Sequence, residues 1–580
     1  MKRTLLFILC FLSSFFSNAQ ELITAYEKSN GTETATYQEG IKFYKKLAQQ
    51  FPQIDIREMG KTDSGEPLHL VVFNKEEKFR FSELQNSEKP ILFINNGIHP
   101  GESDGIDASM MMLRNWAQNI SQHQFLDNVI VAVIPFYNIG GALNRNSTTR
   151  TNQNGPEEYG FRGNAQNYDL NRDFIKMDSK NAFAFAEIFH QLDPDVFIDT
   201  HVTNGSDHQH VVTVLTTQHN KLGGNLGEYL EEEFEPMIFE EMEAKGRNPI
   251  EYVNVHGTTP ENGWTQFWDA PRYSTGYTTL FQTFGFMTED HMWKDYKTRV
   301  ENIFDFLNIA AELTAQEGSK IQKLKAEDRQ QLLKADSLPV MWKNNKDEFK
   351  MVTLEGYSTS KPESELTGNS LLKYDRNDTF EKDVPFYNYY QVEKSVRVPN
   401  YYVIPQAWFE VINRLKANGV KMEALKKDTI ISVEVYHIED FKTVSNPYEG
   451  HYLHYNTKLK KLTQKIAFRK GDYLIDTQQK AKRYIVETLE PEAQDSFFNW
   501  NFFDSILQQK ENFSAYVFEP KAIDILANLP SQEQEEFYEK QEEDSVFAAN
   551  NYAQLDWIFK RSKHYEKAHK RYPVYRLNGK

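Results

Sequence analysis

Three side chains of metal-binding type follow apolar runs in this sequence. His99 and Glu102 lie three residues apart in NNGIHPGESDG, directly after the run ILFI at 91–94. An imidazole and a carboxylate at that spacing can bind one zinc ion from a tight turn, although a lone His-x-x-Glu pair is common by chance. His201 follows a second apolar run, DVFID at 195–199, and Asp199 could orient it. Two His and one Glu would leave a fourth position on zinc for water, whereas His201 alone could equally be a structural histidine at a strand end.

A second pair of polar residues lies between these ligands. Asn171 and Arg172, in QNYDLNRDF, place an amide beside a guanidinium on a predicted turn. Arg binds a carboxylate through two parallel hydrogen bonds and stays charged at any physiological pH. The alternative is an ordinary capped turn with a surface ion pair to Asp169 or Asp173.

Alternating strand-like and helix-like segments must position these groups. From residue 40 to about 315 this alternation predicts an α/β fold, with a mixed, mostly parallel sheet flanked by helices. Polar groups that follow buried strands then meet at the carboxyl edge of the sheet, where sites form in such folds. We expect strands at 68–73, 91–95, 128–135, 195–199 and 211–215, and helices at 40–50, 108–116, 179–190 (capped by Asp178) and 296–313.

The order of these parts resembles the carboxypeptidase A-type zinc metallopeptidase family over roughly residues 40–315. The shared order is strand, His-x-x-Glu, arginine, Asp-x-Asn-Arg, strand, His and a late glutamate. The resemblance implies a zinc carboxypeptidase-like fold in which His99, Glu102 and His201 bind one zinc ion. It also implies that Asn171 and Arg172 hold the terminal carboxylate of a peptide substrate, and that Glu289, in FGFMTEDHMW, is the general base.

Two further roles implied by the family are matched less closely. An arginine that precedes the Asn-Arg pair would stabilise the oxyanion, and Arg162 is preferred over Arg150 and Arg145. A mobile tyrosine before the late glutamate would contact substrate, which gives Tyr277, with Tyr273 as the alternative.

The predicted activity is therefore that of a zinc-dependent metallocarboxypeptidase. One alternative keeps the metal chemistry in an amidase that acts on cell-wall peptides or N-acyl amino acids, which also carry a free carboxylate. A second alternative is a non-catalytic binding protein with the same fold. The motif HPGES (99–103) is closer to cytosolic-type carboxypeptidases that trim acidic tails, which leaves the substrate class open.

The composition limits other functions. The chain has 66 Lys and Arg against 83 Asp and Glu, a net charge of −17, which argues against nucleic acid as a partner. Its single cysteine, Cys10, lies in the leader described next, so the remainder has no disulfide and no thiolate ligand. The segment Asp207-His208-Gln209-His210 could suggest a second metal, but pocket lining or surface is the preferred interpretation.

Residues 1–19 have the pattern of a signal peptide. Lys2 and Arg3 precede an apolar run at 5–12, and Ser17-Asn18-Ala19 forms a small-residue cleavage site. The run is too short to span a bilayer, so we expect an exported protein, periplasmic or extracellular, without stable membrane insertion.

The remaining boundaries follow from changes in composition. We expect a catalytic domain at 20–315, a polar connector at 316–346 and a C-terminal accessory region at 347–580. Strand-like segments at 401–404, 429–436 and 473–475 precede a mostly helical part beyond about residue 478. The accessory region is thus predicted to be β-rich and then helical, with no readable function.

Overall fold

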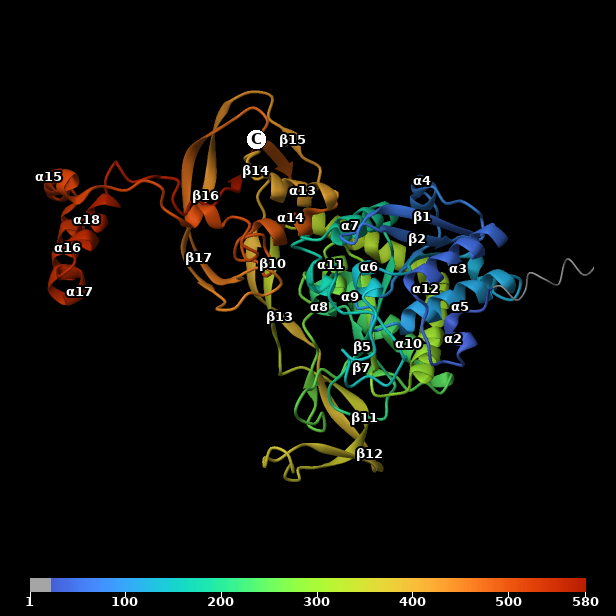
Figure 1. Ribbon diagram of the computed structural model, residues 1–580. Helices are drawn as coiled ribbons and strands as arrows, with labels where there is room; N and C mark the ends of the chain where they lie inside the picture. The colour runs from blue at the N-terminus through green and yellow to red at the C-terminus, as the bar shows by residue number, and fades with distance from the viewer. Residues whose placement is uncertain (1–21, 580) are drawn as a thin grey trace, which may run out of the picture.

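A mixed eight-stranded sheet forms the centre of the first half of the molecule (Figure 1). This computed structural model describes residues 22–579, so the predicted leader lies outside the described residues. The strand order is β1-β2-β4-β3-β5-β9-β6-β7, with parallel pairing from β4 through β3 and β5 to β9. The expected mixed, mostly parallel sheet is confirmed. The strands are β1 (Ile54–Lys61), β2 (Pro67–Phe73), β3 (Ile91–Asn95), β4 (Ile130–Ile134), β5 (Val196–Thr203), β6 (Val212–Thr216), β7 (Ile250–Glu251) and β9 (Phe284–His291).

Helices cover both faces of this sheet. Side chains of successive strand residues point to opposite faces. On β5, Phe197 packs against Phe185 of one helix, whereas Thr200 faces Gly105 of another, so closely that a Cβ on Gly105 would lie 2.1 Å from the Thr200 hydroxyl. The helices are α2 (Ala25–Lys28), α3 (Tyr37–Gln50), α4 (Phe81–Gln85), α5 (Asp104–Gln118), α6 (Ile139–Leu143), α7 (Lys180–Leu192), α8 (His219–Leu222), α9 (Gly224–Tyr229), α10 (Glu235–Ala244), α11 (Ser274–Thr279) and α12 (Tyr296–Lys334). Short turns are η2 (Gln124–Asp127), η3 (Leu170–Arg172) and the π-helical η4 (Leu230–Phe234).

The segment expected to be a polar connector is instead part of the packed structure. Helix α12 runs from Tyr296 to Lys334, so the predicted boundary at residue 315 falls inside it. Lys325 is buried, and its ammonium contacts the carbonyl oxygen of Pro194 and, at 3.2 Å, Asp195. The polar composition of this segment suggested a solvent-exposed linker. In the structure, a charged side chain such as Lys325 instead pairs with groups of the first half of the chain.

No helix within residues 22–579 has the length and apolarity needed to cross a membrane.

The second half contains three smaller sheets. β10 pairs with β13, β11 and β12 form a long hairpin that pairs with β8, and a six-stranded sheet has the order β15-β18-β14-β19-β16-β17. These strands are β8 (Trp264–Thr265), β10 (Ser337–Asn344), β11 (Lys350–Ser360), β12 (Lys373–Tyr387), β13 (Tyr390–Arg397), β14 (Tyr401–Ile404), β15 (Glu423–Ala424), β16 (Thr429–Thr443), β17 (His454–Phe468), β18 (Tyr473–Asp476) and β19 (Tyr575–Leu577). Two helices, α13 (Phe409–Ala417) and α14 (Lys482–Leu489), pack between this sheet and the catalytic domain (Figure 1).

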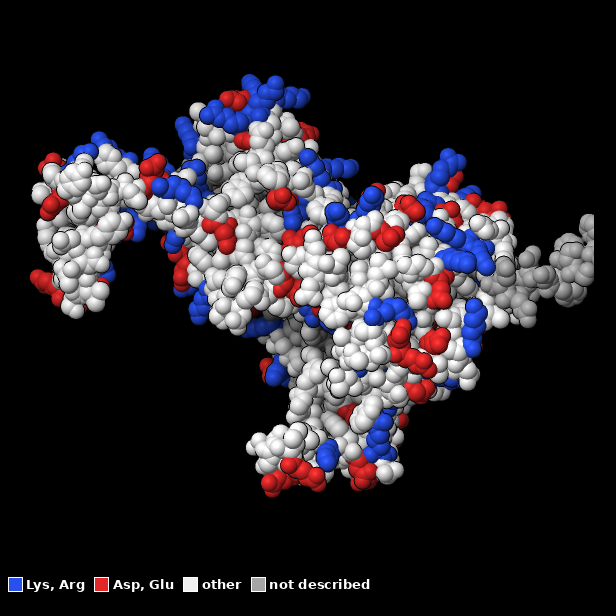
Figure 2. Space-filling model, viewed as in Figure 1, with Lys and Arg blue, Asp and Glu red and all other residues white. Residues whose placement is uncertain are grey.

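A small helical lobe follows and has its own core. Its helices are α15 (Ala515–Ala527), α16 (Ser531–Glu543), α17 (Ser545–Ala548) and α18 (Asn551–Phe559), after the short η5 (Asp504–Leu507). Phe518, Phe537 and Phe559 belong to a hydrophobic cluster separate from the main one. In Figure 2 this lobe and the β11–β12 hairpin project from the body, and positive and negative side chains are mixed over most of that face. The predicted order, β-rich and then helical, is confirmed, with one addition: after the lobe the chain returns to form β19 inside the six-stranded sheet.

Candidate active site

The three predicted metal ligands meet at one edge of the central sheet. His99 and Glu102 lie in the turn after β3, where the Glu102 backbone N–H donates to the His99 carbonyl at 2.8 Å. His201 lies within β5, which runs further than predicted, to Thr203. Because β3 and β5 are adjacent and parallel, with Asn95 opposite Asp199, their carboxyl ends bring the three side chains together.

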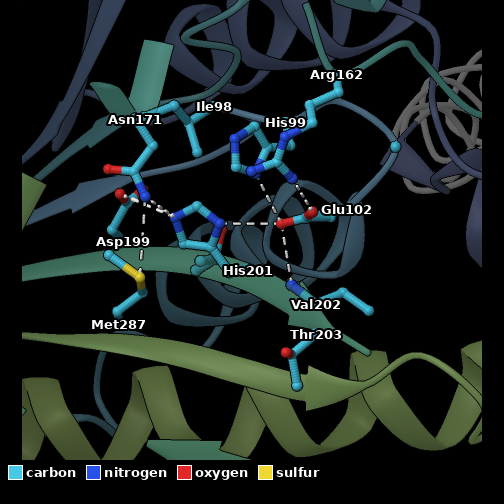
Figure 3. Close-up of polar contacts among 12 residues, drawn as sticks. Ile98, His99, Glu102, Arg162, Asn171, Asp199, His201, Val202, Thr203 and Met287 are labelled. Carbon is cyan, nitrogen blue, oxygen red and sulfur yellow. Dashed lines mark hydrogen bonds and ion pairs between the residues drawn. The ribbon is translucent and has the colours of Figure 1, made fainter. Parts of the chain in front are cut away.

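The three side chains form a compact, buried donor set (Figure 3). One ligand atom from each residue lies within 4.8 Å of the others, and each residue is 2–3 % exposed. The Glu102 carboxylate lies 3.2 Å from His99 Nδ1 and 2.9 Å from His201 Nδ1, and accepts a bond from the Val202 N–H at 3.1 Å. Burial raises the pKa of Glu102, but His99 and Arg150 outweigh it and hold that pKa well below its ordinary value. Glu102 is therefore ionised, as a metal-binding carboxylate must be.

Each histidine is oriented by a second carboxylate. His99 Nε2 lies 2.9 Å from Asp169 Oδ1, and His201 Nε2 lies 3.1 Å from Asp199 Oδ2. A proton held on Nε2 by these acceptors leaves the Nδ1 lone pairs directed at the space beside Glu102, as in carboxylate–histidine–zinc arrangements. The donor set therefore fits a zinc ion. Asp199 was expected in this role, whereas Asp169 was considered only as a surface ion-pair partner; its place two residues before Asn171 was the available signal.

Glu289 lies on the neighbouring strand at the same edge. In β9 it is the direct partner of His201 in β5. Burial raises the pKa of Glu289 to about 7; His201 opposes this rise and the Glu102 carboxylate adds to it. A carboxyl with such a pKa can both accept and return a proton near neutrality.

An open cavity of about 460 Å³ joins these groups. Its wall contains His99, Glu102, His201 and Glu289, together with residues that the sequence did not single out. The latter include Leu215, Tyr252, His256, Phe267 and Met287. They come from strands and loops between His201 and Glu289, a region in which sequence patterns gave no signal for individual pocket residues.

Asn171 and Arg172 both line this cavity from η3. Asn171 is 4 % exposed; its amide nitrogen lies 3.4 Å from His201 Nε2, and its oxygen accepts from the Ser274 N–H at 3.1 Å. The Arg172 guanidinium lies over the Tyr273 ring, 4.5 Å from its centroid, with one N–H bonded to the Asn171 carbonyl. Arg172 is thus held against an aromatic face and remains open to the cavity.

The three candidate arginines occupy different places. Arg150 and Arg162 line the cavity, and their guanidinium groups lie 3.0 and 3.5 Å from Glu102 Oε1. Arg162 also contacts Asp169 at 2.8 Å and is the more exposed of the two. Arg145 is not part of the cavity wall; it bonds the Glu158 carbonyl instead.

The structure does not support the expectation for Tyr277. This side chain is fully buried, and its hydroxyl donates to Asn418 Oδ1 at 2.6 Å, away from the cavity. Tyr273, the alternative, lines the cavity beside Arg172. Both tyrosines flank the start of α11, and the four-residue spacing gave no basis for choosing between them.

The histidines near residue 209 are neither pocket lining nor surface, contrary to the preferred interpretation. His208 and His210 are buried, and His210 Nε2 accepts the N–H of Glu355 from β11 at 3.0 Å. Among residues 22–579, only His99, Glu102 and His201 form a group of three or more His, Asp or Glu side chains that could hold a metal ion. These histidines therefore join the β11–β12 hairpin to the catalytic domain.

Comparison with known proteins agrees with this geometry. Residues 41–223 match the family described as zinc carboxypeptidase, a span that includes the three ligands, Asn171 and Arg172 but ends before Glu289. The chain is 22% identical over 479 residues to carboxypeptidase 2 of Trichophyton tonsurans, covering 76% of this chain and 81% of that protein. The corresponding protein of Trichophyton equinum gives the same values.

Solved structures match part of this chain at lower identity. A metallo-carboxypeptidase from Burkholderia cenocepacia is 18% identical, with a TM-score of 0.36, over 48% of this chain and 69% of that one. One from Pseudomonas aeruginosa is 15% identical, with a TM-score of 0.35, over 47% and 68%. Residues 41–223, which include the metal-binding motif, therefore match a zinc carboxypeptidase domain.

Proposed function

We propose that this chain is an exported, zinc-dependent carboxypeptidase that removes the C-terminal residue of peptides or proteins. The observation that carries the proposal is the single cavity shared by the His99, Glu102 and His201 donor set, Glu289 and Arg172. A metal-binding group, a proton acceptor and a carboxylate-binding guanidinium are the three parts that this reaction needs.

His99, Glu102 and His201 would hold one zinc ion per chain through two Nδ1 atoms and a carboxylate oxygen. When bound, zinc polarises the scissile carbonyl and lowers the pKa of a coordinated water. Asp169 and Asp199 keep the imidazole protons on Nε2, which leaves both Nδ1 atoms free to bind metal.

Glu289 is the proposed general base. It would accept a proton from the attacking water and deliver it to the leaving amide nitrogen. Its raised pKa, about 7, suits both transfers, because a carboxyl that holds its proton too weakly could not act as the acid in the second one.

Arg172 and Asn171 would bind the terminal carboxylate of the substrate and so restrict cleavage to the last peptide bond. Arg172 is charged and faces the cavity, and its stacking on Tyr273 fixes the plane of the guanidinium. Arg162 is the proposed group that stabilises negative charge on the carbonyl oxygen. Arg150 is a second candidate for this role, because its guanidinium also lies close to Glu102.

The cavity residues that come from the chain between Val202 and Met287 favour an uncharged terminal side chain. Among the described cavity residues from Val202 to Met287, none carries a carboxylate that could pair with a terminal Lys or Arg. Leu215, Tyr252, Phe267 and Met287 offer apolar and aromatic surface instead. We therefore propose apolar and aromatic C-terminal residues as the preferred substrates.

Export rests on the leader pattern at residues 1–19 and places the enzyme in the periplasm or outside the cell. The N-terminal sequence of protein recovered from those fractions tests this point. Recovery of protein that begins at Met1 would contradict it.

The activity is tested with zinc-loaded mature protein and a peptide library, each peptide made as free acid and as C-terminal amide. We expect sequential loss of C-terminal residues from the free acids, detected by mass spectrometry. Hydrolysis of N-acyl amino acids or cell-wall peptides alone would favour the amidase. If the purified protein contains no zinc and does not bind added zinc, only the interpretation as a non-catalytic binding protein remains.

Arg172→Ala provides the matching variant test. Loss of charge-assisted hydrogen bonds predicts a decrease of about 10- to 150-fold in kcat/KM for free acids, with little change for amides. Arg145→Ala is the control, because Arg145 lies outside the cavity. Equal losses on both substrate types would contradict carboxylate binding by Arg172.

A further inference from the structure

A two-residue turn from the C-terminal region reaches into the catalytic domain. Between β16 and β17, Tyr448 and His451 exchange backbone hydrogen bonds at 2.7 and 3.0 Å. The two residues between them, Glu449 and Gly450, have φ of 49° and 82°, the left-handed pair that a type I′ turn requires. A Cβ on Gly450 would lie 3.0 Å from the Tyr168 ring, so the turn is seated closely on the catalytic domain.

The turn is bonded directly to the start of the Asp169–Arg172 segment. The Glu449 carboxylate accepts the backbone N–H of Asp169 at 2.8 Å. On the other side of the turn, His451 Nε2 lies 2.7 Å from the Asp178 carboxylate. Glu449 therefore fixes one backbone group of the loop, while His451 holds the turn in place beside it.

The segment that Glu449 holds carries most of the polar groups proposed for substrate and metal. The Asp169 side chain contacts His99 Nε2 at 2.9 Å and Arg162 at 2.8 Å, and accepts the Asn171 N–H at 2.9 Å. Arg172 follows in the same 3-10 turn. A change in the backbone position of Asp169 would therefore move two things together: the carboxylate that contacts His99, and the Asn171–Arg172 pair proposed to bind the terminal carboxylate of the substrate.

A second contact from the same region supports the opposite side of Arg172. The Tyr273 ring lies under Arg172, and the preceding Arg272 lies beside the stacked rings of Tyr448 and Trp500, 5.3 and 5.0 Å from their centroids. Arg272 also forms a 2.6 Å ion pair with Asp495, which is fully buried. Residues from the C-terminal region therefore support both segments that place the Arg172 guanidinium.

We propose that the Tyr448–His451 turn is a positioning element of the carboxylate-binding site, with Glu449 as its positioning residue. The C-terminal region is then a structural part of substrate recognition. This inference rests on the proposed carboxypeptidase function, because it concerns how Arg172 and Asn171 meet a terminal carboxylate.

The test uses the full zinc-loaded chain and two variants. Glu449→Asn tolerates the left-handed conformation, which keeps the turn, but is one methylene too short to reach the Asp169 N–H. Glu449→Gln retains an acceptor oxygen at the original reach and is the rescue variant. Asp440→Asn is the matched control, because Asp440 is an exposed carboxylate on β16 that pairs only with exposed Lys458 among the described residues.

Glu449→Asn should raise KM for free-acid peptides by about 5- to 20-fold, with kcat changed by less than about twofold, because misplacement weakens binding. KM for amide substrates should not change. Zinc affinity should fall modestly, because Asp169 also contacts His99 Nε2, so all variants are assayed at saturating zinc. Glu449→Gln and Asp440→Asn should stay within about twofold of the original KM. In an Arg172→Ala background, Glu449→Asn should add little, since its effect passes through Arg172.

Four outcomes overturn the inference. An unchanged KM in Glu449→Asn would show that the turn does not position the site. Equal losses on acids and amides, or full additivity with Arg172→Ala, would show only general destabilisation. If the unmodified enzyme itself does not prefer free acids over amides, the proposed function fails and the role of the turn fails with it. That last result is recognised before any variant is made.

Discussion

Replacing Asp199 by Asn should weaken zinc binding without removing a ligand. Asp199 is fully buried and bonded to two donors: its Oδ1 accepts from the Asn95 amide at 3.1 Å, and its Oδ2 lies 3.1 Å from His201 Nε2. A carboxylate satisfies both donors, whereas an asparagine side chain offers one acceptor oxygen and one amide donor.

The size of the effect follows from that mismatch. In the variant the introduced amide N–H faces either the Asn95 amide or the His201 Nε2–H, unless the Asn95 amide rotates. Rotation would present the Asn95 oxygen, which has no partner among the described residues, and would set the loss at the lower end of the range given next. A buried donor left without an acceptor costs about 1–3 kcal/mol. The imidazole can avoid this cost by moving its proton to Nδ1, but that tautomer has no lone pair for the metal. We therefore expect zinc affinity to fall by about 10- to 100-fold, which is about 1.4–2.7 kcal/mol.

The assay is competition for zinc with a chelator of known affinity at fixed pH, followed by kcat at saturating zinc. Because Asp199 does not line the cavity, kcat should recover largely once the site is filled. Asp290→Asn is the control: Asp290 is also buried at this edge, but neither of its oxygens has a hydrogen-bond partner among the described residues. Zinc affinity within about twofold of the original in Asp199→Asn would refute the reasoning on tautomers.

Two further predictions concern the base and the interface between the two halves. Glu289→Gln should retain zinc but lower kcat by about 10²-fold or more, measured under saturating substrate; unchanged turnover would place the base elsewhere. Asp178 pairs with His451 across the interface and with Lys176 on its own side; burial raises its pKa, but these two groups outweigh burial and lower it from 3.8 to about 2. Because the folded pKa lies below the unfolded one, the stabilisation is present above about pH 4 and lost as pH falls toward 2. Asp178→Asn should therefore reduce the free energy of unfolding by about 2 kcal/mol at pH 6 in urea titrations, and a difference that persisted unchanged at pH 2 would contradict the ion-pair origin.

The metal site could be predicted from sequence because its residues follow buried strands. A strand such as IVAVI at 130–134 is apolar throughout, and the polar residue that follows such a run must lie at the sheet edge. His99 and Glu102 follow β3, and His201 lies near the carboxyl end of β5, so their convergence required only that β3 and β5 be neighbours.

Residues placed by loops or by the second half could not be predicted in this way. Asp178 was expected to cap α7, but Ser179 is the cap, and the Asp178 carboxylate is used by Arg414 and His451 instead. Tyr277 and Tyr273 differ by one helical turn, and only packing shows which of them faces the cavity. Nothing near Glu449 in the sequence indicates a partner 280 residues away.

The position of β19 constrains the order in which the second half can fold. This strand pairs with both β14 and β16, so it joins the two parts of the six-stranded sheet, and Arg576 within it pairs with the buried Glu490. The sheet is therefore incomplete until residue 577 has left the ribosome, and its β14–β18 and β16–β17 parts remain unjoined before that point. Removing residues from the C-terminal side would take out this joining strand together with the helical lobe. The lobe, whose helices span residues 515–559, has a separate core, so only its removal as an internal segment would leave β19 in place.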